Sequence, residues 1–327
     1  MSGARPGGCA VIPSPDLEPA AIRAAHGRID PVFTNSPQYV HDGLSARLGT
    51  PVIVKVETVN PIRSFKGRGT WVAMATLAGE GTVGPVRAVV CVSAGNFGQG
   101  VAYAARALGV PAVVFCSTRA NRAKVARMRA LGATVIESGD DFDDARGASE
   151  AYAAEHGAHL LVDGDDARIS TGAATLALEV TDGAAAGMLP MPVVAVVPVG
   201  NGALINGVGS WLRHAAPGCR VVGVQAEAAA AMTLSWRAGR PIDTDSAATY
   251  ADGIASRVAI PAAVELMPGR VDQMITVSET ALRAAQAELT DELGITVEGA
   301  GAASWAGLVA AERPAGPALV IVTGSNA

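Results

Sequence analysis

The chain has 327 residues, of which 50% are hydrophobic and 17% are charged, and its formal net charge is -5. This length suffices for one large domain or two modest ones. The acidic balance and the absence of basic runs exclude an electrostatic footprint for DNA or RNA, so we expect no nucleic-acid partner.

Membrane and metal-binding classes are also disfavoured by the sequence. No uninterrupted apolar stretch is long enough to span a bilayer, so we expect no membrane contact. Residues 1–15 lack the basic-then-apolar pattern of a secretory signal. The four cysteines have no paired metal spacing and the five histidines do not cluster, so neither a metal site nor a Ser-His-Asp triad is indicated. The positions of the cysteines do not indicate disulfide bonds, which fits a reducing compartment. We therefore expect a cytoplasmic protein.

Short apolar runs alternate with helix-compatible stretches along the chain. The predicted strands are 52–56, 88–92, 112–116, 134–137, 159–162, 193–197, 220–225, 273–277 and 318–323. The predicted helices are 18–26, 41–48, 71–78, 98–108, 121–131, 142–156, 172–181, 204–214, 228–238 and 279–293. This alternation predicts parallel strands with helices on both faces, in two adjacent α/β lobes.

Segment 60–70, which follows the first of these strands, reads Asn-Pro-Ile-Arg-Ser-Phe-Lys-Gly-Arg-Gly-Thr. It places Lys66 at a loop-to-helix junction at the carboxyl end of a strand, the edge where open α/β sheets bind ligands. Phe65 offers a flat apolar face, and Gly67 and Gly69 leave space beside the lysine. Desolvation and crowding favour the neutral amine that a Schiff base needs. Because a lone lysine in such a loop is usually only exposed, the interpretation depends on the other segments.

Residues 64–69, Ser-Phe-Lys-x-Arg-Gly, resemble the cofactor-attachment segment of the serine/threonine dehydratase family of fold type II (tryptophan-synthase-β-like) pyridoxal-phosphate enzymes. The resemblance implies pyridoxal 5'-phosphate bound to Lys66, with Phe65 near its ring. It also implies two open, twisted, mostly parallel sheets flanked by helices. The large cofactor-binding domain would comprise 1–77 and 166–327, and a small inserted α/β domain would comprise 78–165.

A second segment, which begins Ser93-Ala94-Gly95-Asn96, follows the predicted strand 88–92 and opens a helix. Such a turn directs backbone N–H groups and a helix N-terminus toward an anion, although a Gly-rich helix start without a ligand would look the same. The segment is similar to the family's Ser-x-Gly-Asn-His, with Phe97 in place of the histidine. By that resemblance Asn96 holds the ring oxygen of the cofactor, and Ser93, Ala94, Gly95 and Asn96 bind the substrate carboxylate.

A third segment joins the predicted strand 193–197 to the following helix and consists of Gly200, Asn201, Gly202, Ala203 and Leu204. Small residues after a strand expose successive N–H groups, which form a phosphate-binding nest. The segment does not have the glycine spacing of a dinucleotide-binding loop, because Ile205 stands where the third glycine is needed. The segment resembles the family's tetraglycine phosphate loop, so these five residues are expected to hold the cofactor phosphate.

The predicted strand 318–323 ends in Thr323-Gly-Ser-Asn. This could be a frayed terminus, but it resembles the family's Ser/Thr/Cys-Gly-x-Asn ending. By that resemblance Thr323 faces the pyridine nitrogen of the cofactor.

The resemblance implies a lyase in which Lys66 carries the cofactor and then acts as general base. It would eliminate the β-hydroxyl of a small serine/threonine-like amino acid to give a 2-keto acid and ammonia. Two alternatives stay open: a β-replacement synthase that makes a non-standard amino acid through the same aminoacrylate, and a non-catalytic cofactor-binding or interaction protein. The intact set of Lys66, Asn96 and Thr323 disfavours the last. We expect a homodimer.

Overall fold

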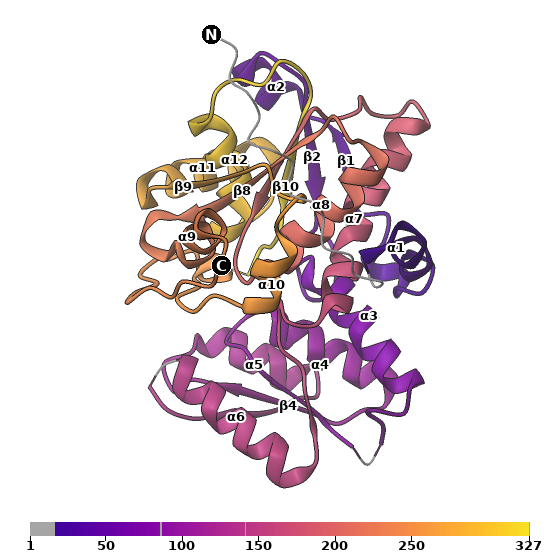
Figure 1. The fold of residues 1–327 in the computed structure, drawn as a ribbon, viewed down its shortest axis with the longest axis vertical. Coiled ribbons are helices and arrows are strands. Elements are labelled where there is room, and N and C mark those ends of the chain that lie inside the picture. Colours follow the sequence, from indigo (N-terminus) through magenta and orange to yellow (C-terminus); the bar gives the residue numbers. More distant parts are fainter. Residues whose placement is uncertain (1–16, 86, 141, 327) are drawn as a thin grey trace.

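A computed structural model describes residues 17–85, 87–140 and 142–326, and two β-sheets organise them. The larger sheet has six strands in the order β1-β2-β10-β7-β8-β9, and the smaller has four in the order β5-β4-β3-β6. In Figure 1 the smaller sheet, with α4, α5 and α6, lies below the larger one. The fold is therefore α/β with two sheets, as the sequence predicts.

The strands of the larger sheet are β1 (Gln38–Val40), β2 (Val52–Val56), β7 (Val194–Pro198), β8 (Arg220–Ala226), β9 (Gln273–Val277) and β10 (Ala318–Val322). Those of the smaller sheet are β3 (Val89–Val92), β4 (Ala112–Cys116), β5 (Thr134–Glu137) and β6 (His159–Leu160). All pairings between these strands are parallel except that of β1 with β2. Parallel strands covered on both faces explain the continuous apolar runs in the sequence.

The helices are α1 (Pro19–His26), α2 (Asp42–Leu48), α3 (Lys66–Gly79), α4 (Asn96–Leu108), α5 (Arg122–Ala130), α6 (Phe142–His156), α7 (Ala167–Ala185), α8 (Ala203–Ala215), α9 (Ala231–Ala238), α10 (Pro261–Leu266), α11 (Glu279–Leu293) and α12 (Gly299–Ala310). A short 3-10 turn, η4, spans Asp252–Ile254. Across the part of the chain that the structure describes, no helix is long and apolar enough to cross a membrane.

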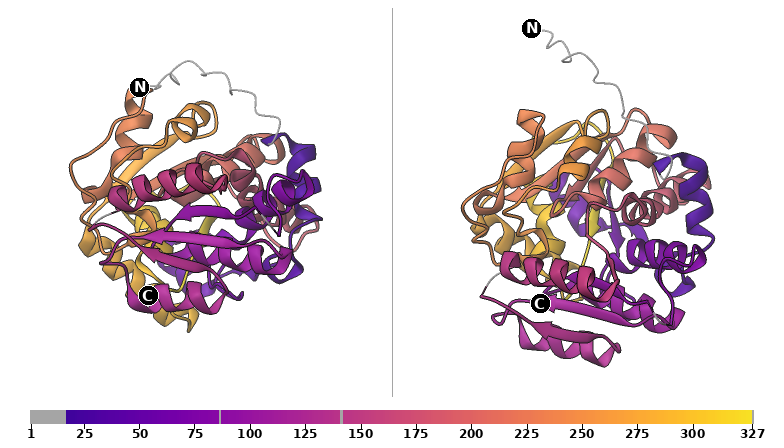
Figure 2. Two further views of the ribbon diagram at one scale, coloured as in Figure 1. Left: turned by 90° about the horizontal axis from the view of Figure 1, so that it is seen from below. Right: turned by 60° about the horizontal axis from the view of Figure 1, so that its bottom comes forward.

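Helices cover both faces of each sheet. On the larger sheet, α1, α7, α8 and α10 pack against one face, and α2, α11 and α12 pack against the other. On the smaller sheet, α4 and α5 lie against one face and α6 against the other, which the turned views of Figure 2 show. The carboxyl ends of β3, β7 and β10 all meet one cavity, because residues at or after those ends line it.

Several predicted elements differ in extent from the observed ones: α3 begins at Lys66 and not at 71, α9 begins at Ala231 and not at 228, and α7 and β6 differ as well. The prediction for α7 covers only 172–181, whereas the helix spans Ala167–Ala185. Gly172 lies within this helix. At this position a Cβ would come within 2.4 Å of the Arg68 carbonyl oxygen, so a larger residue would clash with α3. The glycine thus allows α7 to approach α3 closely and does not mark a helix end. The strand predicted at 159–162 ends at Leu160, since the Val162 carbonyl turns to accept bonds from the following loop.

Candidate active site

A cavity of about 380 Å³ lies between the parts of the chain that contain the two sheets. All of the site residues predicted from the sequence line it: Phe65, Lys66, Ser93, Ala94, Gly95, Asn96, Gly200, Asn201, Gly202, Ala203, Leu204 and Thr323. They come from four segments far apart in the sequence. The fold therefore gathers the predicted residues around one space, as the strand-end argument predicts.

Lys66 is the first residue of α3, and its side chain is only 14% exposed. Its Nζ donates to Oδ2 of Asp163 at 2.7 Å. The same Nζ lies 4.8 Å from the ring centroid of Phe65 and 5.9 Å from that of Phe97. The amine thus faces the cavity between two aromatic rings and one carboxylate.

The two glycines beside Lys66 make room for protein and not for a ligand, which corrects the sequence interpretation. A Cβ on Gly67 would lie 2.2 Å from a ring carbon of Phe33. A Cβ on Gly69 would lie 2.5 Å from the carbonyl oxygen of Ile169 at the start of α7. These close approaches hold the first turn of α3 against its neighbours and so fix the direction in which Lys66 leaves the helix.

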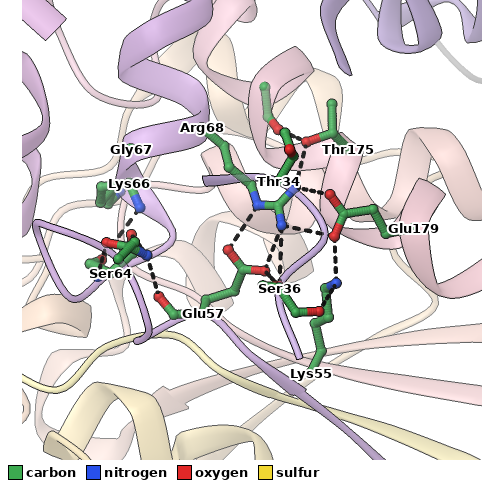
Figure 3. Close-up of polar contacts among 12 residues, drawn as sticks. Thr34, Ser36, Lys55, Glu57, Ser64, Lys66, Gly67, Arg68, Thr175 and Glu179 are labelled. Atoms are coloured by element: carbon green, nitrogen blue, oxygen red, sulfur yellow. Dashed lines mark hydrogen bonds and ion pairs between the residues drawn. The ribbon is translucent and has the colours of Figure 1, made fainter. Parts of the chain in front are cut away.

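A buried ionic cluster of Lys55, Glu57, Arg68 and Glu179 lies behind this first turn (Figure 3). The Arg68 guanidinium is fully buried and donates to both carboxylates, to Glu57 at 2.8 and 2.9 Å and to Glu179 at 2.7 and 2.9 Å. Lys55 on β2 donates to the second oxygen of Glu179 on α7 at 2.5 Å. Two cations and two anions thus compensate one another in a buried site, and they tie β2, α3 and α7 together.

The cluster also controls the protonation of Glu179. Burial by itself would raise the pKa of this carboxyl. The hydrogen bonds from His26 and Arg68, with the charges of Arg68 and Lys55, outweigh burial and hold the pKa well below its usual range. A carboxyl with a depressed folded-state pKa contributes stability that is fully present above its unfolded pKa, about 4.3, and is lost as the pH falls further.

We therefore expect acidification below about pH 4 to destabilise the protein more steeply than it destabilises a Glu179→Gln variant. Urea unfolding followed by tryptophan fluorescence across a pH series measures the difference between the two slopes. The matched control is Glu80→Gln, which removes an exposed partner of Arg168. Parallel pH dependences of the starting protein and the Glu179 variant would show that the cluster does not hold this charge.

Asn96 belongs to a closed ring of three hydrogen bonds at the far wall of the cavity. Its Nδ2 donates to Oε1 of Glu298 at 2.7 Å, and its Oδ1 accepts from Nδ2 of Asn326 at 2.7 Å. The backbone N–H of Asn326 completes the ring by donating to Oε2 of Glu298 at 2.9 Å. Because a carboxylate can only accept, the ring fixes which end of the Asn96 amide is the donor.

Two contacts join α5, beside the smaller sheet, to this wall. Arg127 donates to Oδ1 of Asn326 at 2.7 Å, and Lys124 forms an ion pair with Asp252. Burial raises the pKa of Glu298, and the nearby Asp252 raises it further against the opposing effect of Lys124. The wall that contains Asn96 is thus built from residues beside the smaller sheet and from residues that belong to the part of the chain with the larger sheet.

Segment 200–204 forms another part of the cavity lining. Gly202 has φ of +94° and caps α8 without a side-chain hydrogen bond, which leaves the first N–H groups of the helix without a side-chain acceptor. A Cβ on Gly200 would lie 2.7 Å from the Gly253 carbonyl oxygen, so only glycine fits there. An uncapped helix N-terminus beside backbone N–H groups suits a phosphate. The donor set of this segment therefore fits the phosphate group of pyridoxal phosphate.

Two residues of the site, Asp163, which contacts Lys66, and Asn326, which contacts Asn96, have no role assigned from the sequence. Asp163 follows β6, so a carboxylate just after a strand was the available signal. Its position in sequence gives no indication of the contact, because 97 residues separate it from Lys66.

Comparison with known proteins agrees with this arrangement. Residues 29–324 match the family described as "Pyridoxal-phosphate dependent enzyme". The L-threonine dehydratase biosynthetic IlvA of Mycobacterium leprae is 34% identical over 319 residues, covering 96% of this chain and 73% of that protein. The L-threonine ammonia-lyase of Thermotoga maritima is 34% identical over 86% of this chain and 69% of its own length.

A solved structure shows the same fold. The processed form of threonine deaminase isoform 2 from Solanum lycopersicum superposes with a TM-score of 0.84 at 27% identity, covering 100% of this chain and 90% of that one. The match extends over both sheets and over all four segments that line the cavity. The chain therefore belongs to the family of pyridoxal-phosphate-dependent enzymes and has the fold type II architecture.

Proposed function

We propose that the protein is an ammonia-lyase that eliminates the β-hydroxyl of threonine, serine or a similar amino acid and releases a 2-keto acid and ammonia. The observation that carries the proposal is the convergence of Lys66, the turn at Asn96, the segment 200–204 and Thr323 on one cavity. The relatives whose printed names are threonine dehydratase or threonine ammonia-lyase support the choice of reaction and substrate.

The cofactor would be held at three points. Segment 200–204 would bind its phosphate, Asn96 its ring oxygen and Thr323 its ring nitrogen. When bound, pyridoxal phosphate supplies an aldehyde carbon that bonds reversibly to amines and a ring that accepts electrons. The hydroxyl of Thr323 is neutral, so it provides no charge to keep the ring nitrogen protonated.

The other steps of the reaction are carried out by side chains and backbone groups of the protein. Lys66 holds the cofactor at rest and takes the proton from the substrate Cα during turnover. The Ser93–Asn96 turn, at the N-terminus of α4, would bind the substrate carboxylate through backbone N–H groups. Phe65 and Phe97 line the cavity beside Lys66 and reduce the access of water to its amine.

The test is a substrate screen on purified protein loaded with pyridoxal phosphate. We expect L-threonine, L-serine or a bulkier β-hydroxy amino acid to give keto acid and ammonia in equal amounts. If none does, and an added thiol or amine is instead built into a new amino acid, the β-replacement synthase replaces this proposal.

We also propose the division into a large domain, 1–77 and 166–327, and a small inserted domain, 78–165. The position of β3 to β6 within Val89–Leu160 supports it, while residues 1–16 lie outside the described part of the chain. A cytoplasmic homodimer that binds no nucleic acid is proposed on the acidic composition and on the three free, buried cysteines of the described residues. Light scattering of the purified protein tests the dimer.

A further inference from the structure

Among the described carboxylates that line the cavity, Asp163 is the one with a buried oxygen that has no hydrogen-bond partner. These carboxylates are Glu150, Asp163, Asp252 and Glu298. Within the described residues, Glu150 pairs with Arg146, Asp252 with Lys124, and Glu298 accepts one bond on each oxygen. Oδ2 of Asp163 accepts from Lys66, whereas its Oδ1 is buried and has no hydrogen-bond partner.

A buried carboxylate oxygen without a donor is costly, because it has lost its water and gained nothing in exchange. This oxygen belongs to a side chain that faces the cavity and is 12% exposed. The Asp163 carboxyl group therefore borders the space that a hydroxyl or amine of a ligand would occupy. The same oxygen would repel a ligand group that carries negative charge.

The backbone fixes Asp163 in this place. Gly164 follows it with φ of +90°, and a Cβ there would lie 2.5 Å from the Asn201 carbonyl oxygen. The Asn201 side chain also lies 3.4 Å from Oδ2 of Asp163. Asp163 is thus held between the segment 200–204 and Lys66, the residue whose amine takes the substrate proton in the proposed function.

We infer that Asp163 is a catalytic residue that passes a proton from Lys66 to the departing β-hydroxyl. This inference depends on the proposed elimination. Asp163 would then be needed for substrates whose leaving group must be protonated as it departs, such as a hydroxyl. Substrates whose leaving group departs as a stable anion would not need Asp163.

The proton and electron balance is complete without another reagent. The Cα–H bond breaks and its proton moves to the neutral amine of Lys66, while its electron pair forms the second bond between Cα and Cβ. The Cβ–O bond breaks and its electron pair leaves with oxygen. The proton then moves from Nζ to the Asp163 carboxylate, 2.7 Å away, and from Asp163 to that oxygen, which departs as water. Lys66 ends neutral and Asp163 ends ionised, as both began.

The experiment compares two substrates of nearly the same shape, L-serine and β-chloro-L-alanine, because chloride leaves without a proton. Asp163→Asn keeps the shape of the side chain and removes its ability to carry the proton. We expect the initial rate on L-serine to fall about a hundredfold, the size of a general acid–base effect, and the rate on β-chloro-L-alanine to change less than about threefold. The matched control is Asp165→Asn, two residues away on the exposed surface and outside the cavity lining.

Two readouts besides turnover separate catalysis from folding. Titration of the cofactor-free variant with pyridoxal phosphate, followed by absorbance, should reach saturation and give the colour of the bound cofactor, which shows that the variant folds and loads. Mass spectrometry of L-serine recovered from heavy water should show deuterium at Cα, since Lys66 still removes that proton. An Asp163→Glu variant keeps a carboxyl, so its ratio of serine to chloroalanine turnover should return toward the original.

An equal fall on both substrates, or no fall on either, overturns the proton relay and leaves the proposed elimination intact. Failure of the proposed function looks different, because the unaltered protein would then form no keto acid from any β-hydroxy amino acid.

Discussion

We expect replacement of Lys66 with alanine to lower keto-acid formation by about ten thousandfold, the upper end of what removal of a positioned base costs. The variant loses the amine that faces the cavity between Phe65 and Phe97, and no other lysine can take its place. The chain has three lysines in all, Lys55, Lys66 and Lys124. Lys55 is fully buried in the ionic cluster, and Lys124 is engaged with Asp252.

The small number of lysines makes the attachment test decisive. Borohydride reduction of the loaded protein, followed by peptide mapping, should place the adduct on Lys66 alone. Lys124→Arg is the control, since it keeps the charge beside Asp252 and should keep both the colour of the protein and its adduct. An adduct on Lys124, or a coloured Lys66→Ala protein that turns over at the normal rate, contradicts the assignment.

Replacing Arg68 with leucine should lower the free energy of unfolding by about 3–5 kcal/mol, the usual cost of removing one partner from a buried ion pair. Both Glu57 and Glu179 then lose their main donor while remaining buried. Lys55 still neutralises one of them, but the other stays charged and uncompensated. The loss should therefore exceed that of an ordinary core substitution.

Denaturant unfolding at neutral pH measures this loss, with Arg119→Leu as the control. Arg119 pairs with Asp140 at 3.8 Å, and both side chains are at least 75% exposed, so its removal should cost less than about 1 kcal/mol. If the two variants lost similar free energies of unfolding, the buried cluster would stabilise the protein no more than an exposed ion pair does.

The sequence predicted the segments around the cavity better than the contacts between them. Lys66 and the segment 200–204 each follow a strand, and the rule for the carboxyl ends of parallel strands brought them to one edge correctly. Asp163 was missed although the strand before it was predicted, because a carboxylate after a strand does not indicate which side chain it contacts. The contact with Lys66 joins the loop after the smaller sheet to a helix that follows the larger one, which no local pattern reports.

The secondary structure was likewise predicted well in some elements and poorly in others. Apolar runs of five residues predicted β2 and β4 without error, since burial on both faces demands them. Strand β1 (Gln38–Val40) was missed because it is short, lies at the edge and is only partly buried. In α7, Gly172 resembled a boundary because a glycine placed for close helix packing looks like one that ends a helix.

The place of β10 in the larger sheet has a consequence for biosynthesis. It is the last strand in the chain, yet it lies between β2 and β7. A ribosome releases β2 and β7 well before the strand that joins them, whereas all four strands of the smaller sheet precede β7. The nascent protein therefore passes through a state in which the smaller sheet can close while the larger one has two unpaired apolar edges, the kind of surface that attracts other chains. Throughout that interval the cavity lacks Thr323, so its lining is complete only after β10 has joined the sheet.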